Sequence, residues 1–159
     1  MTAQQMRTPT PEGVLRAAAK IADLLVKTPL IEAEVNGTAV WFKAECLQPV
    51  GAFKIRGAWH RLSDLSAEER ARGVVGVSSG NHAQGVAWAA RRLGIPATIV
   101  MPVDAPQVKI DATRGMGAEV VLYDRPGGED RDEVAQRLID QSGAVLVHAF
   151  ADPWVIEGQ

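Results

Sequence analysis

Two short stretches of this chain combine residue types that could carry out chemistry on a small anionic molecule. In the first, Gly51-Ala52-Phe53-Lys54-Ile55-Arg56-Gly57-Ala58, Lys54 lies at the start of an expected helix. A lysine there meets the positive end of the helix dipole, and its neighbours Phe53 and Ile55 desolvate it. Both effects lower the pKa of the amine and make it a better nucleophile. The alternative is a solvated lysine in the first turn of a helix.

The second stretch, Ser78-Ser79-Gly80-Asn81-His82-Ala83-Gln84-Gly85, joins an expected strand to an expected helix. Gly80 lets the backbone turn sharply, and the helix N-terminus offers unpaired N–H groups to an anion. Ligands of open α/β sheets bind at the carboxyl ends of the strands, which favours a ligand site at this turn. The alternative is that Ser79 or Asn81 only caps the helix.

The other groups that could bind a metal or act as a nucleophile are isolated in the sequence. His82 could act as a general base, but a histidine at a helix start more often orients or caps a neighbouring group. His60 is expected on the exposed side of its helix. His148 is expected at the end of a strand. No two of the three histidines have the spacing of metal ligands, so no metal site is expected. Cys46 is the only cysteine, which excludes an intramolecular disulfide, and we expect it to be packed.

The composition indicates a globular protein without the features of a membrane or nucleic-acid-binding protein. Of the 159 residues, 47% are apolar and 23% are charged, so a packed core in one or two units is expected. The net charge is −2 with scattered basic residues, which predicts no nucleic-acid partner. The first residues, from Met1 to Arg7, lack the apolar segment of a secretory signal, and no apolar run could span a bilayer. These absences predict a cytoplasmic location and no membrane partner.

The first half of the chain is expected to contain helices and one hairpin. Thr10-Pro11-Glu12 is typical of a helix start, and Asn36-Gly37 is typical of a tight hairpin turn. The expected elements are a helix over residues 10–25, a hairpin over 30–44, a helix over 53–65 and a short helix over 66–73.

The second half alternates regularly between short apolar strands and helices. The expected strands cover residues 74–77, 97–101, 119–123 and 145–148, and the expected helices between them cover 82–93, 107–116 and 131–141. Strands that are apolar on both faces and rich in Val and Ile are typical of a buried parallel sheet. The pattern therefore predicts the α/β class, with a three-layer parallel sheet covered by helices on both faces. A further helix is expected to begin near Trp154.

In this order, the motifs resemble those of the serine/threonine dehydratase family, which includes threonine ammonia-lyases and serine racemases. The similarity covers almost the whole chain, and its main segments are Lys27-Thr28-Pro29-Leu30, Phe42-Lys43-Ala44-Glu45, Phe53-Lys54-Ile55-Arg56-Gly57-Ala58, the stretch from Ser78 to Gly85, Ala105-Pro106 with Lys109, His148-Ala149-Phe150, Asp152-Pro153 and Gly158-Gln159. The resemblance implies the fold of the fold-type II pyridoxal phosphate enzymes, similar to the β subunit of tryptophan synthase.

The resemblance also implies a cofactor, a substrate and roles for individual residues. The cofactor is pyridoxal 5'-phosphate, and Lys54 would form a Schiff base with its aldehyde and later move protons at the substrate α-carbon. Phe53 would pack on the pyridine ring, and Asn81 would bind the phenolic oxygen of the cofactor. The substrate would be a small hydroxy amino acid, from which α,β-elimination gives a 2-oxo acid and ammonia. Its α-carboxylate would be held by Ser78, Ser79, Gly80, Asn81 and His82.

Two residues bear on which other activities are possible. Ser79 stands where many dehydratases have alanine, and a serine at this place in serine racemases protonates the opposite face of the substrate carbon. Racemisation is therefore an alternative activity. His82 stands where cysteine-synthase-type enzymes typically have threonine, which argues against β-replacement. A non-catalytic module that binds a small molecule or a partner chain is the remaining alternative.

The resemblance further predicts how the chain is divided. Residues 1–72 would form an incomplete N-terminal part of the large cofactor domain, residues 73–148 the small α/β domain, and residues 149–159 the start of the return into the large domain. No stretch matches the glycine-rich loop that binds the cofactor phosphate in the family. We therefore expect the chain to be a truncated N-terminal portion with little activity alone, and the full-length form to be a homo-oligomer.

Overall fold

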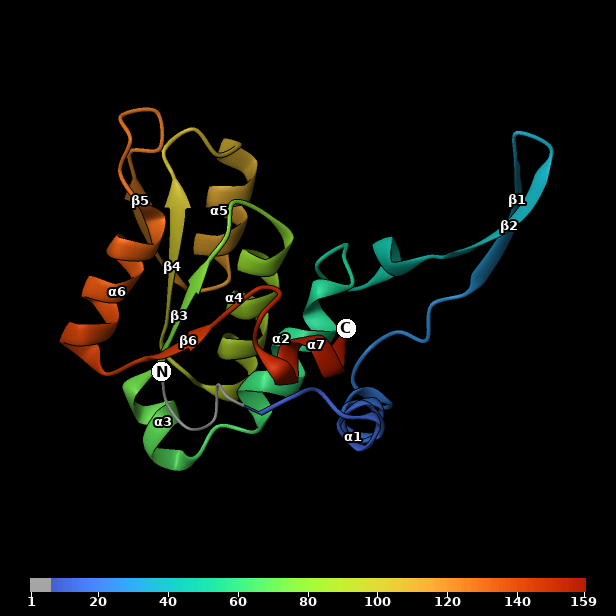
Figure 1. Cartoon of the computed structure of the whole chain (residues 1–159), viewed down its shortest axis with the longest axis horizontal. Coiled ribbons are helices and arrows are strands. Elements are labelled where there is room, and N and C mark those ends of the chain that lie inside the picture. Colours follow the sequence, from blue (N-terminus) through green and yellow to red (C-terminus); the bar gives the residue numbers. More distant parts are fainter. Residues whose placement is uncertain (1–6) are drawn as a thin grey trace.

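The computed structural model describes residues 7–159, and its centre is a parallel sheet in the second half of the chain (Figure 1). The sheet has four strands in the order β5-β4-β3-β6. These strands are β3 (Val74–Val77), β4 (Ala97–Pro102), β5 (Glu119–Tyr123) and β6 (Val145–Val147). The predicted parallel sheet is thus confirmed. Residues 1–6, which fall in the segment predicted to carry no secretory signal, lie outside the described residues.

Helices cover both faces of this sheet, as the sequence predicts. One face packs against α4 (Asn81–Leu93) and α5 (Gln107–Gly115), and the other packs against α6 (Arg131–Ser142). Successive residues of a strand face opposite sides, so Val74 enters the core under α4 while Val75 enters the core under α6. The strands are therefore apolar on both faces because each face has its own core.

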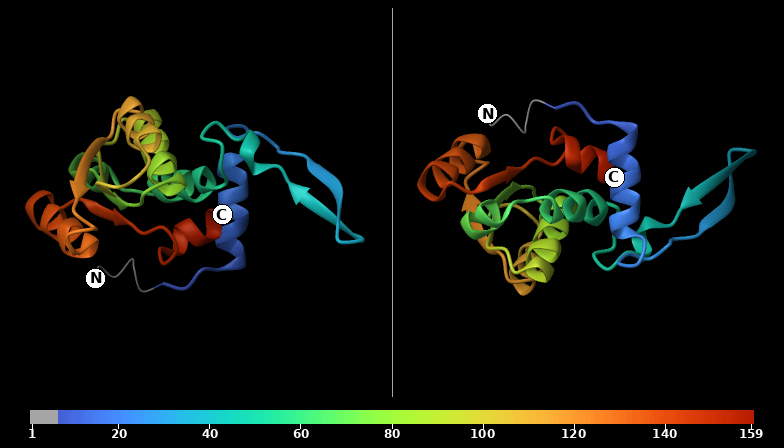
Figure 2. Two further views of the ribbon diagram at one scale, coloured as in Figure 1. Left: turned by 90° about the horizontal axis from the view of Figure 1, so that it is seen from above. Right: turned by 90° about the horizontal axis from the view of Figure 1, so that it is seen from below.

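A helical layer outside α4 carries the first stretch singled out in the sequence. It consists of α2 (Lys54–Ser63), which packs on α4, together with α1 (Pro11–Ile21) and α7 (Pro153–Gly158), both of which pack on α2. The 3-10 helix η2 (Glu45–Leu47) precedes α2, and α3 (Ala67–Arg72) follows it. Figure 2 shows α1 lying across the short α7, so the start and the end of the described chain are neighbours.

The hairpin of β1 (Leu30–Val35) and β2 (Thr38–Lys43) projects away from the rest of the molecule (Figures 1 and 2). Asn36 and Gly37 both have positive φ angles, of 51° and 76°, which matches the predicted tight turn. Large apolar side chains of the hairpin are exposed, including Trp41 at 62% and Leu30 at 60%. An exposed apolar surface of this kind is typical of a contact surface for further polypeptide.

Two expectations from the sequence are wrong. His60 was expected on the exposed side of its helix, but it has no solvent exposure, because α7 covers that face of α2. Cys46 was expected to be packed, but it is exposed on η2. The sequence around His60 carries no apolar pattern that reveals the helix covering it. No helix among residues 7–159 combines the length and the apolar character needed to cross a bilayer.

Candidate active site

Lys54 is the first residue of α2, and the loop before it is held by a buried glutamine. The side-chain amide of Gln48 bonds to both the N–H and the C=O of Val26, at 3.2 and 2.9 Å. Gly51 then turns the chain with a φ of 68°, and its N–H donates to the Gln48 carbonyl at 2.7 Å. The start of α2 is therefore fixed by the loop rather than by a capping side chain, since its N-cap residue Phe53 makes no side-chain cap.

The carboxylate of Glu45 links η2 to α2 at Arg56, two residues after Lys54. It accepts two hydrogen bonds from the Arg56 guanidinium, both at 2.7 Å, and one from the Thr28 hydroxyl at 2.6 Å. The ammonium of Lys43 lies 3.3 Å away. These contacts, the Arg56 hydrogen bonds foremost, lower the pKa of Glu45 to about 2. The charge of Arg56 is thereby neutralised close to Lys54.

The second stretch forms an uncapped helix start. Gly80 occupies the N-cap position of α4, and no side chain caps the first turn. The hydroxyl of Ser78 instead accepts from the Gly80 N–H at 3.2 Å, which shapes the turn before the helix. Ser79 and Asn81 are exposed. The first N–H groups of a helix have no partner within it, so this turn presents main-chain donors to solvent or to a ligand. The alternative that Ser79 or Asn81 caps α4 does not hold.

The two stretches meet through a backbone contact between α2 and α4. A Cβ atom placed on Gly85 would lie 3.1 Å from the carbonyl carbon and oxygen of Lys54 and 3.2 Å from the Ile55 nitrogen. Gly85 is one helical turn beyond Asn81, so the starts of α2 and α4 lie against each other. The charge of Lys54 also contributes to lowering the pKa of His82, which places both side chains in one electrostatic environment.

The Lys54 amine is half-buried and forms no ion pair with the residues described, 7–159. It donates to the Ala149 carbonyl at 2.8 Å and to the side-chain oxygen of Gln159. Burial lowers the pKa of Lys54 below its usual range. A lysine without a carboxylate partner and with a lowered pKa is suited to nucleophilic chemistry on a carbonyl group.

The side chain of His82 faces the sheet and not the turn that it belongs to. It is buried, and its Nε2 lies 2.9 Å from the Val147 carbonyl, so Nε2 carries the hydrogen. Burial, the largest cause, lowers the pKa of His82 to about 4, and the ring is neutral at neutral pH. His82 can therefore contribute to a bound carboxylate only through its main-chain N–H.

Lys109 was given no role by the sequence, but it adds a positive charge beside the turn. Its ammonium lies 3.2 Å from the Asn81 side-chain oxygen and 3.3 Å from that of Gln84. Lys109 is in the first turn of α5, which follows the strand next to β3. Because the carboxyl ends of neighbouring parallel strands share one edge, its position after β4 is the signal that could have indicated it.

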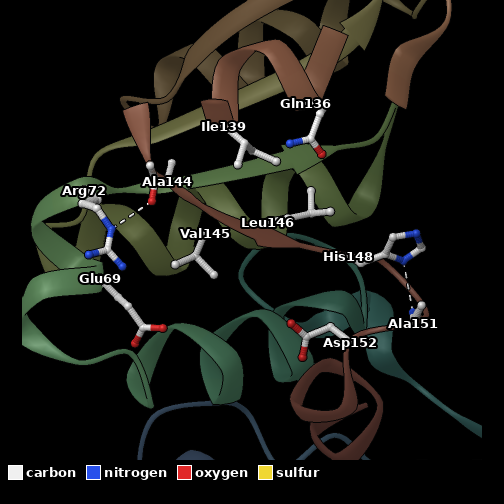
Figure 3. A pocket seen from close by; sticks show the side chains of 11 residues that line it. Glu69, Arg72, Gln136, Ile139, Ala144, Val145, Leu146, His148, Ala151 and Asp152 are labelled. Carbon is white, nitrogen blue, oxygen red and sulfur yellow. Dashed lines mark hydrogen bonds between the residues drawn. The ribbon is translucent and has the colours of Figure 1, made fainter. Parts of the chain in front are cut away.

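The cavity drawn in Figure 3 lies elsewhere, at the open edge of β6. It has a volume of about 390 Å³, and its lining does not include Lys54 or the turn of residues 78–82. Its polar groups are engaged: Asp152 pairs with Arg61 at 2.8 Å, and the Nδ1 of His148 accepts from the Ala151 N–H at 3.1 Å. Among residues 7–159, no His, Cys, Asp and Glu side chains form a group that could hold a metal. The Lys54 region is the better candidate because it combines a nucleophile with main-chain donors that no side chain caps.

The fold is of the α/β class, and Lys54 with the turn of residues 78–82 forms its candidate site. Residues 21–159 match the family model described as "pyridoxal-phosphate dependent enzyme", and the chain belongs to this family. Members of the family depend on pyridoxal phosphate. The fold is that of the fold-type II enzymes of this class.

Similar proteins with known activities cover nearly all of the chain. It is 48% identical to an L-threonine ammonia-lyase of Thermotoga maritima, over 94% of the chain and 38% of that protein. It is 44% identical to an L-threo-3-hydroxyaspartate ammonia-lyase of Saccharomyces cerevisiae, over 97% of the chain and 48% of that protein. The structure of maize serine racemase superposes with a TM-score of 0.88 at 37% identity, covering 96% of the chain and 47% of the racemase. The chain thus spans about half the length of these relatives or less.

The pairing of Glu45 with Arg56 and Thr28 predicts a pH-dependent contribution to stability. The pKa of Glu45 is lower in the folded state, so the contribution is fully present above about pH 4.5 and is lost as the pH falls toward 2. We expect Glu45→Gln to reduce the free energy of unfolding at pH 7 by about 1–3 kcal/mol. The difference from the parent protein should shrink at pH 3. Urea unfolding at both pH values measures this, with the exposed Glu32→Gln as the control. An equal loss at both pH values would contradict the assignment.

Proposed function

We propose that this chain belongs to a pyridoxal-phosphate-dependent ammonia-lyase that converts L-threonine or L-serine to 2-oxobutanoate or pyruvate and ammonia. The observation that carries the proposal is the contact between two helix starts, one bearing the Lys54 amine and the other the uncapped turn of residues 78–82. Two of the similar proteins are ammonia-lyases acting on hydroxy amino acids, which supports this substrate class.

The residues present fit the aldehyde end of the cofactor. The Lys54 amine has only neutral oxygen partners, and its pKa is lowered by burial, so it can react with an aldehyde. Phe53 is exposed beside it, with the amine 5.1 Å from the ring centroid, and could pack against a planar ring. Asn81 offers its side-chain amide at the start of α4 and would bind the phenolic oxygen. When bound, pyridoxal phosphate supplies an electron sink that makes the α-proton of an amino acid acidic.

In this proposal the chain's own residues bind the substrate and move its proton. The main-chain N–H groups at the start of α4, with the hydroxyls of Ser78 and Ser79, hold the α-carboxylate. Lys109 strengthens the positive potential of this turn. Anchoring the carboxylate orients the α-C–H bond toward Lys54, which removes the proton. Because the pKa of Lys54 is lowered by burial, more of its amine is free to accept that proton at neutral pH.

We further propose the domain division expected from the sequence, with residues 1–72 in the large cofactor domain, 73–148 in the small domain, and 149–159 leading back to the large domain. The exposed apolar hairpin of β1 and β2 supports this, because it offers a surface for further polypeptide. The relatives have about twice the length of this chain, or more, which supplies a partner for that surface. The homo-oligomer stays a prediction.

The role of Lys54 can be tested by trapping the cofactor on the chain. We expect incubation with pyridoxal phosphate and reduction with borohydride to leave the cofactor mass mainly on the peptide containing Lys54. The reason is the lowered pKa, since each unit raises the unprotonated fraction at neutral pH by about tenfold. Peptide mass spectrometry measures the label at each lysine. Lys54→Arg should remove this label, whereas Lys27→Arg, at an exposed lysine, should not. Labelling of Lys54 no stronger than that of Lys27 would contradict the proposal.

Serine racemisation is the second candidate function, and Ser79 favours it. Its side chain is exposed at the turn, where a hydroxyl could deliver a proton to the substrate, and maize serine racemase is a close structural match.

A hybrid protein separates the two activities: this chain continued by the second half of maize serine racemase. We expect Ser79→Ala to lower the formation of D-serine more than the formation of pyruvate, because only racemisation needs the second proton donor. Chiral chromatography and a pyruvate assay measure the two products. Ser78→Ala is the matched control and should lower both, since Ser78 shapes the turn. Equal losses in Ser79→Ala would remove the case for a racemase.

A further inference from the structure

The two acceptors of the Lys54 amine are both neutral oxygen atoms. One is the main-chain carbonyl of Ala149, in the segment after β6, and the other is the side-chain amide of Gln159, directly after α7. A neutral amine has two N–H groups and one lone pair, whereas an ammonium group has three N–H groups. The two oxygen acceptors can therefore be satisfied by either form, and neither of them adds a negative charge that would favour the ammonium form.

Gln159 is held in place because α7 is fastened tightly to α2. A Cβ on Gly57 would lie only 2.5 Å from the Val155 carbonyl oxygen, and one on Gly158 would lie 2.7 Å from the Gly57 Cα. The helices thus touch backbone to backbone just before Gln159. At the other end of α7, Asp152 caps the helix by accepting from the Trp154 N–H at 2.9 Å.

A buried carboxylate on α7 adds a second anchor without reaching the lysine. Glu157 accepts from the Thr10 N–H at 2.9 Å and from the Arg7 guanidinium, and its other neighbour is His60 at 3.4 Å. Although burial opposes it, these hydrogen bonds lower the pKa of Glu157, so it stays charged and bound to this end of α1. The partners of the Glu157 carboxylate are therefore Arg7, Thr10 and His60, and Lys54 is not among them.

The other charged groups on the elements around Lys54 are likewise accounted for. On α2, Arg56 is paired with Glu45, and on α4, His82 is neutral at neutral pH. On α1, Lys20 pairs with Asp64. Within residues 7–159, no carboxylate forms an ion pair with the Lys54 amine. Lys54 shares this property with Lys109, whose two acceptors on α4 are also uncharged oxygen atoms.

We propose that Gln159 is a positioning residue for Lys54: with the Ala149 carbonyl, its neutral amide oxygen holds the amine at the start of α2 without placing a negative charge beside it. The inference rests on the proposed nucleophilic role of Lys54. A carboxylate at position 159 would stabilise the ammonium form and reduce the nucleophile at neutral pH. An apolar side chain would remove one acceptor, and the ammonium form would lose more than the neutral amine.

The experiment measures the amine itself and needs no cofactor. Each lysine of the whole chain is labelled by brief reductive methylation with formaldehyde and cyanoborohydride at a series of pH values, and peptide mass spectrometry gives the rate at each site. We expect Gln159→Glu to raise the apparent pKa of Lys54 and to slow its labelling at pH 7.5 about tenfold, the effect of one unit. Gln159→Leu should shift the pKa in the opposite direction.

Matched controls separate this effect from a general change in charge or folding. Gln107→Glu adds the same charge on the exposed side of α5 and should leave the Lys54 profile unchanged. Lys27, which is exposed, serves as the internal reference in every variant, and circular dichroism checks folding. An unchanged Lys54 pKa in a folded Gln159→Glu protein would overturn the proposal. If that variant does not fold, a Gln159→Leu profile that is unchanged or shifted upward would overturn it equally. If pyridoxal phosphate fails to label Lys54 while these shifts occur, the proposed function fails and the positioning role stands.

Discussion

The arrangement of the candidate site depends on the direct contact of two helix backbones, α2 and α4. Gly85 makes this contact possible, because any larger residue would place a carbon atom 3.1 Å from the Lys54 carbonyl. The contact is closer than side-chain packing allows, so the start of α2 has little freedom relative to the first turn of α4. An amine and a set of free N–H donors are thereby held on one side of the molecule. The sheet, in turn, fixes α4 through the core shared by Val74, Val86 and Ile99.

The charged groups around this contact also hold the neighbouring elements in place. The buried or half-buried carboxylates of Glu45, Asp152 and Glu157 are each bound to an arginine, and these pairs fasten η2, α2, α7 and the segment before α1 to one another. Removing either partner of a buried pair leaves a charge without compensation, which makes such links costly to break. Lys54 stands apart from this network, since both of its acceptors are uncharged. Uncharged acceptors do not oppose the lowering of its pKa by burial.

Much of this fold could be predicted from the sequence because its local signals agree with its tertiary structure. The Asn36-Gly37 turn and the strand-helix alternation from residue 74 onward gave the hairpin and the three-layer sheet. Burial on α2 was predicted wrongly at His60, because the helix that covers it, α7, comes almost a hundred residues later. The large sequence separation is also the reason why the partners of Lys54 could not be predicted. Ala149 and Gln159 reach the amine only through the return of the chain after β6, and no local pattern in the sequence encodes that return.

The central claim is that the Lys54 amine and the turn of residues 78–82 form one site for one small ligand. Nuclear magnetic resonance of the labelled protein can test this with phosphopyridoxyl-L-serine, a stable secondary amine that joins the cofactor ring to an amino acid. The account predicts that the signals of the Lys54 side chain and of the Ser79 to His82 amides shift together during titration, with one shared dissociation constant. Shifts confined to one of these two places, or to residues such as Leu146 at the β6 edge, would contradict it.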